Sequence, residues 1–291
     1  MPAFDDLHLD RPPTPEEPEP RDRSTAFIVV GLIVAAILIG GLVWWARRPA
    51  AVNNAPQTSA VKAPEAVKPP QAVSGENIDL PPLADSDSLV RQLVSRLSSH
   101  PRVAQWLTTD QLIRNFTVVL VNIGDGRTPT PHLQKMRLKA PFAAARDGHG
   151  LYINPDSYRR FDADADAVSG LDPQGTARLY ETLKPRIQDA YRELGYPDGN
   201  VDAALRRAIV LLLKTPVVEG RIGLNGPPPL YTFSDDRLEL LTGSQRQLLR
   251  MGPRNERLVQ EKLRAIAPLV GIAPQDLPPS TVLHDRGSPP I

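Results

Sequence analysis

AFIVVGLIVAAILIGGLVWWA, residues 26–46, contains no charged side chain and runs directly into Arg47 and Arg48. Twelve of its residues are Phe, Ile, Leu or Val. A helix of this length is roughly 30 Å long, which matches the hydrocarbon core of a bilayer, and its insertion is favoured by about 5 kcal/mol. The stretch predicts a membrane-spanning helix that separates a short amino-terminal part from a long carboxyl-terminal part.

Two other interpretations of this stretch are weaker. Signal peptides have shorter apolar regions that follow a basic segment, whereas residues 1–25 are acidic and no small-residue cleavage site follows the apolar run. A buried core helix of this length would normally contain polar interruptions. The membrane therefore becomes the first expected partner, bound through residues 26–46.

The flanking charges do not decide the orientation of this helix. Arg11, Arg21 and Arg23 on one side balance the basic residues Arg47, Arg48 and Lys62 on the other. Small residues spaced four apart, such as Gly31 with Ala35, would allow two such helices to approach closely, although ordinary Gly and Ala content explains them equally well. Self-association through the membrane helix stays an open hypothesis.

The segments around the helix differ in composition. Residues 1–25 form an acidic, Pro-rich tail that cannot bury enough apolar surface to fold. Residues 47–78 repeat Ala, Val, Pro and Lys, a pattern typical of a flexible tether. Residues 79–272 have the periodicity of one α-rich soluble domain, and residues 273–291 return to a Pro-rich, loose tail.

Within residues 79–272 the pattern is mainly helical. Apolar residues at helical spacing follow residues 85–88, 108–111 and 172–173, which have the composition of helix starts. Pro185 lies inside the longest helical pattern and predicts a kink or a break there. Residues 141–153 predict a short hairpin, and residues 221–224 and 230–233 predict paired strands. We expect an α+β domain, mainly α with a small β component.

Composition excludes several chemistries. The chain has no Cys, so disulfides, thiolate metal sites and a Cys nucleophile are ruled out. Residues 77–272 carry 26 Lys or Arg against 22 Asp or Glu, an excess too small and too dispersed for nucleic-acid binding. Motifs of serine hydrolases, zinc proteases, P-loop proteins and dinucleotide-binding proteins are missing. No cofactor is expected.

Asp162, Asp164 and Asp166 alternate like the first three ligands of a calcium loop, but Ala167 stands where that loop needs Gly and Pro173 where it needs Glu. A solvated acidic helix end is the better interpretation, and no metal site is predicted. The isolated histidines also lack ligand spacing.

Several longer phrases carry a family resemblance: LIRNF at 112–116, GLYINPDSYRRFD at 150–162, AYRELGYPDG at 190–199, TPVVEGRI at 215–222 and LLRMGPRN at 248–255. In this order they resemble the bacterial family catalogued as domain of unknown function 3014, over roughly residues 80–267. The resemblance implies a Gram-negative envelope protein with one membrane helix, a cytoplasmic amino terminus and a periplasmic domain. It implies no activity, and the stretch ADADAVSG departs from the more apolar helix of the family.

Three places could bind a ligand. Residues 127–146 contain basic side chains with no acidic residue between them, a run that could engage phosphate or carboxylate groups unless it is merely a solvated surface. Residues 195–200 and 250–255 combine turn formers with polar side chains, although a helix stop followed by a helix start explains them too. The candidate ligand-binding residues are Arg127, Lys135, Arg137, Lys139, Tyr196, Asp198, Arg250 and Asn255.

These observations lead to two hypotheses about function. The first is a non-enzymatic, single-pass protein of the bacterial inner membrane whose tethered domain binds an envelope protein or a cell-wall component. The alternative is a hydrolase that cuts cell-wall glycan or peptide with a carboxylate pair, for which Glu181 and Glu219 are the named candidates. No residue is assigned a catalytic role on sequence grounds.

Overall fold

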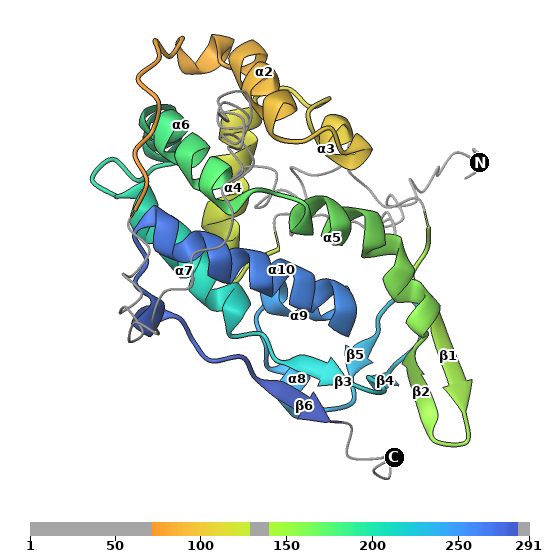
Figure 1. The fold of residues 1–291 in the computed structure, drawn as a ribbon. Helices are drawn as coiled ribbons and strands as arrows, with labels where there is room; N and C mark the ends of the chain where they lie inside the picture. Colours follow the sequence, from red (N-terminus) through yellow and green to blue (C-terminus); the bar gives the residue numbers. More distant parts are fainter. Residues whose placement is uncertain (1–71, 129–139, 285–291) are drawn as a thin grey trace, which may run out of the picture.

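A computed structural model describes residues 72–128 and 140–284 of the chain (Figure 1). The helices of this part are η3 (Leu83–Asp85), α2 (Asp87–Leu97), α3 (Pro101–Trp106), α4 (Leu112–Gly124), η5 (Pro155–Phe161), α5 (Asp162–Ser169), α6 (Pro173–Glu193), α7 (Val201–Leu213), α8 (Asp236–Glu239), α9 (Gly243–Leu249), α10 (Pro253–Ile266), η6 (Ala267–Val270) and η7 (Pro274–Asp276). The strands are β1 (Ala144–Asp147), β2 (Gly150–Ile153), β3 (Val217–Glu219), β4 (Leu224–Asn225), β5 (Thr232–Phe233) and β6 (Val282–His284). The expected α+β class, mainly helical with a small β component, is confirmed.

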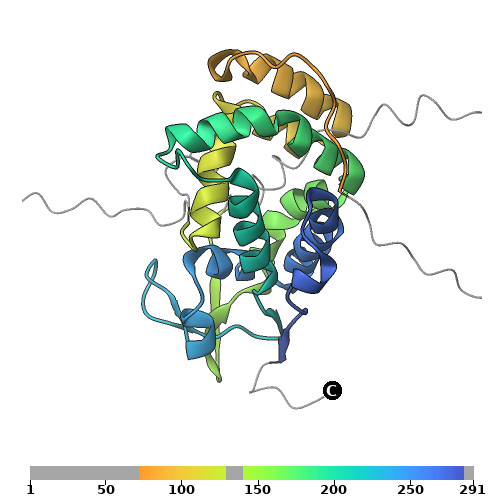
Figure 2. The ribbon, with the colours of Figure 1, turned by 90° about the vertical axis from the view of Figure 1, so that its left-hand side faces the viewer.

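The larger of two apolar clusters lies among the long helices. Figure 2 shows α6 crossing the upper ends of α4 and α7, with α2 above α6 and α10 below it, beside α7. Leu120, Ile123, Leu179, Ile209 and Leu263 from these helices are at most 1 % exposed. Burial of apolar area at about 25 cal/mol per Å² makes this packing the main source of stability.

Helix α6 begins where the sequence predicts. The Asp172 carboxylate accepts a 2.6 Å hydrogen bond from Gly175 N, and Pro173 occupies the first turn. The helix runs through Pro185 without the break allowed for in the sequence analysis. Leu183 and Ile187 are both buried, so side chains on either side of the proline hold the helix against the core.

A second, smaller apolar cluster lies beneath the strands and includes Ile153, Val218, Phe233, Leu238 and Leu249. Strands β1 and β2 form the predicted antiparallel hairpin, with Ala144 opposite Ile153. Strands β4 and β5 form the predicted pair, whereas β3 and β6 pair in parallel with Val217 opposite Val282. Each of these sheets has only two strands, so the packing of helices against them supplies most of their stability.

The folded domain extends beyond the predicted limits of residues 79 and 272. Val73 N donates a 3.0 Å hydrogen bond to Leu269 O, and Glu76 N donates a 2.8 Å hydrogen bond to Thr182 Oγ1. At the other end, η7 and β6 belong to residues predicted as a loose tail. The sequence pattern does not indicate either extension, because each contains few apolar residues and their partners lie far away in the sequence.

In the part of the chain that the structure describes, no helix is long and apolar enough to cross a bilayer. The predicted acidic tail, the membrane helix at 26–46 and the tether up to residue 71 lie outside that part.

Candidate functional site

Two of the phrases that carry the family resemblance meet in space. Asn255 lies at the start of α10 and Tyr158 in η5, and the Asn255 amide donates to Tyr158 O at 3.1 Å and to Asp162 Oδ1 at 2.9 Å. Gly252, three residues before Asn255, has φ +81°. It lies so close to the Tyr158 ring that a Cβ at this position would come within 3.0 Å of three ring atoms. Residues 150–162 and 250–256 thus form one junction.

Asn255, a predicted ligand-binding residue, is 2 % exposed and also donates to Met251 O at 3.1 Å. Its amide hydrogens are therefore engaged with three protein acceptors. The side chain positions the junction and presents no donor to solvent. No sequence signal distinguishes this role from ligand binding, because a polar residue after Gly-Pro suits both.

Glu256, the next residue, was not singled out by the sequence analysis. Its side chain is 0 % exposed, and neither carboxyl oxygen has a hydrogen-bond partner among the described residues. Burial raises the pKa of the Glu256 carboxyl well above its usual range. The available signal is helical spacing, because Glu256 precedes the buried Val259 by three residues and Leu263 by seven.

The three alternating aspartates lie in helix α5, not in a metal-binding loop. Asp164 accepts two hydrogen bonds from Arg102, at 2.6 and 2.9 Å, and Asp166 accepts one from Arg254 at 2.7 Å. Residues 72–128 and 140–284 contain no group of three His, Asp or Glu arranged to hold a metal ion. Here the aspartates join α5 to α3 and α10.

Arg250, a second predicted ligand-binding residue, lies directly after α9 with its guanidinium 5.5 Å from the centre of the Phe233 ring. Its side chain makes no hydrogen bond or ion pair with any residue in the described ranges. Burial lowers the pKa of Arg250, the charge of Arg246 lowers it further, and Glu239 acts in the opposite direction. Arg250 and Asn255 belong to the same sequence phrase, 248–255, but Arg250 lies against the Phe233 ring and Asn255 against η5 and α5.

Tyr196 and Asp198 lie in the loop between α6 and α7. The Tyr196 ring stacks on Tyr191 with centroids 4.7 Å apart, whereas Asp198 is exposed. Gln188 fixes the loop from α6, since it donates to Gly199 O at 2.8 Å and accepts from Val201 N at 3.0 Å. The loop is therefore held in one conformation by side chains of the helix before it.

This loop borders an open hollow of about 550 Å³. Glu181, Lys184 and Gln188 of α6 form one side, and Asp198 and Asn200 of the loop form another. Side chains of both signs of charge line it together with Pro185 and Pro197, so it offers a partner hydrogen-bonding groups beside apolar surface.

Lys184 is the best-connected side chain of the hollow. Its ammonium lies 2.7 Å from Asp202 Oδ2 and 3.2 Å from Glu181 Oε2. Burial lowers the pKa of Lys184, but the two carboxylates outweigh that effect and leave it raised. Tyr180 donates to Asp202 at 2.7 Å, and its pKa is raised first by burial and then by that hydrogen bond. Glu181 is thus tied into a network of structural ion pairs.

The two carboxylates named for hydrolysis do not face each other. Glu181 lies in α6, at the top of Figures 1 and 2, while Glu219 lies in β3, near the bottom. Glu219 forms an ion pair with Arg257. A glycosidase needs its two carboxyl groups about 5–10 Å apart across the scissile bond, an arrangement that these two do not provide.

Of the predicted basic run, Arg127 lies in the described part and forms an ion pair with Asp125. Lys135, Arg137 and Lys139 lie outside the described residues, so their placement stays a prediction.

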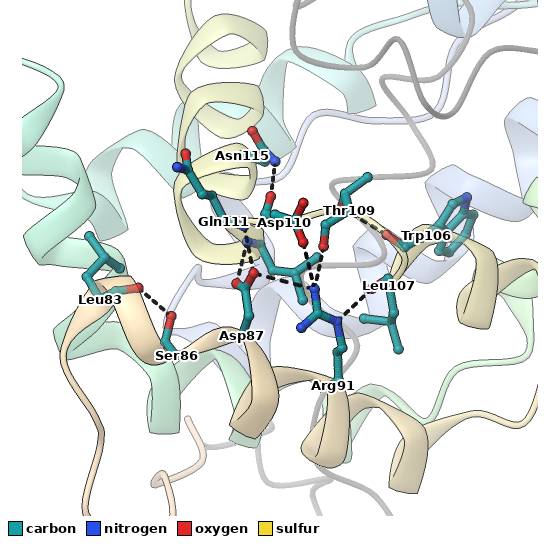
Figure 3. Close-up of polar contacts among 11 residues, drawn as sticks. Leu83, Ser86, Asp87, Arg91, Trp106, Leu107, Thr109, Asp110, Gln111 and Asn115 are labelled. Carbon is teal, nitrogen blue, oxygen red and sulfur yellow. Dashed lines mark hydrogen bonds and ion pairs between the residues drawn. The ribbon is translucent and has the colours of Figure 1, made fainter.

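A further polar cluster, between α2 and α4, has a structural role. Asp87 accepts hydrogen bonds from Gln111 N at 2.7 Å and Leu112 N at 2.8 Å, and so caps α4 from another helix (Figure 3). Arg91 donates to Leu107 O and Thr109 O at 2.9 and 2.8 Å. This pairing supports Gln111 at φ 56°, a conformation uncommon for residues with a side chain.

A family model described as "Protein of unknown function (DUF3014)" matches residues 112–267. The match confirms the resemblance drawn from the phrases, from α4 to the start of η6. No curated protein and no solved structure matches the chain.

Proposed function

This chain belongs to the family of proteins of unknown function DUF3014, and from that premise we propose that it is a membrane-anchored envelope protein whose domain binds a partner. The partner we propose is a protein or a cell-wall component that docks in the hollow between α6 and α7. The anchor is the apolar stretch at 26–46, with the amino terminus in the cytoplasm and the domain in the periplasm.

The observation that supports this proposal is the set of contacts that hold the loop beside the hollow. Gln188 holds Gly199 and Val201, and the Tyr191–Tyr196 stack holds the start of the loop. Asp198 projects from it and makes no hydrogen bond or ion pair within the described ranges. A binding loop that is ordered in advance loses less conformational entropy when the partner docks.

A binding role is also preferred to hydrolysis on the positions of the carboxylates. Glu181 is engaged with Lys184, and Glu219 with Arg257, in separate parts of the domain. Incubation of the full-length protein with purified wall material tests the alternative directly. If the wild type releases soluble fragments and the Glu181→Gln and Glu219→Gln variants do not, hydrolysis is the function and the binding proposal is wrong.

Site-specific photo-crosslinking in cells tests the proposed surface. A photoreactive residue at position 198 of the full-length chain should give a crosslinked adduct, whereas one at the exposed Glu261 of α10 should not. With the photoreactive residue moved to position 200, Asp198→Lys should lower the adduct yield about fivefold, the effect of losing roughly 1 kcal/mol of contact. Equal adducts from positions 198 and 261, or none from 198, would contradict the proposal.

A reporter fused after Ile291 tests the compartment. A reporter that is active only in the periplasm should give a signal, and one that is active only in the cytoplasm should not. The reverse pattern would place the domain on the cytoplasmic side and remove cell-wall partners from consideration.

A further inference from the structure

Arg250 is a half-buried cation that forms no ion pair among the described residues. Its guanidinium faces the Phe233 ring at 5.5 Å and makes no hydrogen bond there, and the carboxylate of Glu239 raises its pKa without forming an ion pair with it. A cation–π contact compensates only part of the cost of removing a guanidinium from water. The position therefore favours an anion that the domain itself does not supply.

The surroundings of Arg250 are cationic as well. Arg246, one helical turn earlier, forms an ion pair with Glu239, and Glu239 also accepts a 2.8 Å hydrogen bond from Phe233 N. This carboxylate is thus already engaged twice. Arg160 of η5 is a further guanidinium near enough to feel the charge of Arg250, and its pKa is lowered to about 10 by burial and then by that charge.

Two main-chain carbonyl groups help to hold Arg160 in place. Its Nε donates to Ser157 O at 2.8 Å and its Nη1 to Ala140 O at 3.4 Å, while the guanidinium lies 5.4 Å from the Phe142 ring centre. Phe142 in turn contacts Tyr231 at 5.6 Å between ring centres. Aromatic rings therefore border the region on both the Arg160 and the Arg250 side.

From this arrangement we propose that Arg250, flanked by Arg160 and Arg246, binds a compact oxyanion of the phosphate or carboxylate type next to the Phe233 ring. Guanidinium groups engage both kinds of oxyanion with paired N–H donors, and a partly desolvated site strengthens such hydrogen bonds. Residues 129–139, which precede Ala140, contain no Asp or Glu that could serve as the anion. The proposal does not depend on the hollow between α6 and α7, so either can fail alone.

Thermal unfolding of the full-length protein in a neutral detergent gives a direct test. Trp44→Phe and Trp45→Phe leave the buried Trp106 as the sole tryptophan, and its fluorescence then reports unfolding of the domain. Sodium phosphate near 100 times its dissociation constant should raise the unfolding midpoint by about 5 °C relative to sodium chloride at equal ionic strength. Sodium acetate tests the carboxylate type in the same way.

Two variants separate binding from structure. Arg250→Gln should abolish the shift caused by phosphate or acetate and leave the midpoint in chloride unchanged or higher, because it removes an uncompensated cation. Arg254→Gln, the matched control, should keep the shift, since Arg254 already pairs with Asp166 at 2.7 Å. A purely structural Arg250 would give the opposite result: a lower midpoint in chloride and an unchanged response to the anions.

Lipid nanodiscs distinguish the source of the oxyanion. A higher midpoint in phosphatidylglycerol than in phosphatidylcholine discs, lost in Arg250→Gln, assigns the site to a lipid headgroup. A response to dissolved phosphate in phosphatidylcholine discs assigns it to a soluble ligand. If neither lipid nor dissolved oxyanion shifts the wild-type midpoint, or if Arg250→Gln responds as the wild type does, the proposal is overturned.

Discussion

The side-chain amide of Asn255 donates a 3.1 Å hydrogen bond to the main-chain carbonyl of Tyr158, 97 positions earlier in the chain. The same amide reaches Asp162 Oδ1 at 2.9 Å. These two contacts fasten α10 to the segment that follows the β1–β2 hairpin. They bring together two phrases that lie far apart in the sequence.

Replacement of Asn255 by Ala should therefore lower the free energy of unfolding by about 1–3 kcal/mol, because buried acceptors lose their donor. Asn122→Ala is the matched control: Asn122 is also helical and makes one bond, to Val118 O four residues earlier. Urea unfolding followed by circular dichroism measures both. A cost for Asn255→Ala no larger than that of Asn122→Ala would show that the bonds to η5 and α5 contribute nothing.

Gly252→Ala should be more destabilising than Gly271→Ala. Both glycines have φ +81°, but only the new methyl group at position 252 would overlap the Tyr158 ring; at position 271 no atom lies within 4 Å. The left-handed backbone of Gly271, with ψ 16°, costs a side chain about 1 kcal/mol, whereas Gly252, with ψ 163°, has a conformation found essentially only in glycine. The overlap with the ring adds roughly 1–3 kcal/mol at position 252. Equal losses in the two variants, measured by thermal unfolding, would mean that both the backbone at position 252 and the Tyr158 ring adjust freely.

Gly75→Ala should detach residues 72–78 from α6. A Cβ at position 75 would lie 2.6 Å from Thr182 N, and helix backbone cannot yield there. We expect limited proteolysis near residue 75 to accelerate and the midpoint of thermal unfolding to fall by a few degrees, as for a loss of about 1 kcal/mol. Gly148→Ala, with nothing within 4 Å at the hairpin turn, should leave both measurements unchanged.

Glu256 makes stability depend on pH. Burial raises the pKa of Glu256 in the folded state. Below about pH 4 the side chain is neutral in both the folded and the unfolded chain, so titration of Glu256 then takes nothing from the free energy of unfolding. As the pH rises above the unfolded pKa, the unfolded chain loses its proton first. Stability then falls by up to about 1.4 kcal/mol per pH unit until the folded pKa is reached.

Glu256→Gln removes this titration. The difference in unfolding free energy between the variant and the wild type should grow in favour of the variant from pH 4 to pH 7, as measured by urea unfolding. Asn122→Ala, which removes no titratable group, serves as control and should leave the difference constant. A constant difference for Glu256→Gln as well would mean that Glu256 is ionised in the folded domain.

Local patterns account for most of the helical framework. The cap at Asp172 and the hairpin at 141–153 depend on neighbouring residues, so sequence spacing predicts them. Burial on one face of each long helix follows from periodicity in the same way.

Relationships between distant residues could not be predicted from one sequence. The parallel pairing of Val217 with Val282 involves short strands whose partners nothing local identifies. In the sequence, Asn255 and Arg250 are both polar residues near a turn. In the structure, Asn255 is buried with its amide donors engaged, whereas the pKa of Arg250 is lowered by burial and by the charge of Arg246. Burial and charge environment, which decide chemical role, arise only when separate segments pack together.

The contacts of Val73 and Glu76 have a mechanical consequence. Through them the chain enters the domain against η6 and α6, next to the main apolar cluster and away from the β strands. Tension applied from the amino-terminal side would first strain the hydrogen bonds of Val73 to Leu269 and of Glu76 to Thr182. If these give way, residues 72–78 would peel from α6 and lengthen the segment that leads into the domain before any long helix is disturbed.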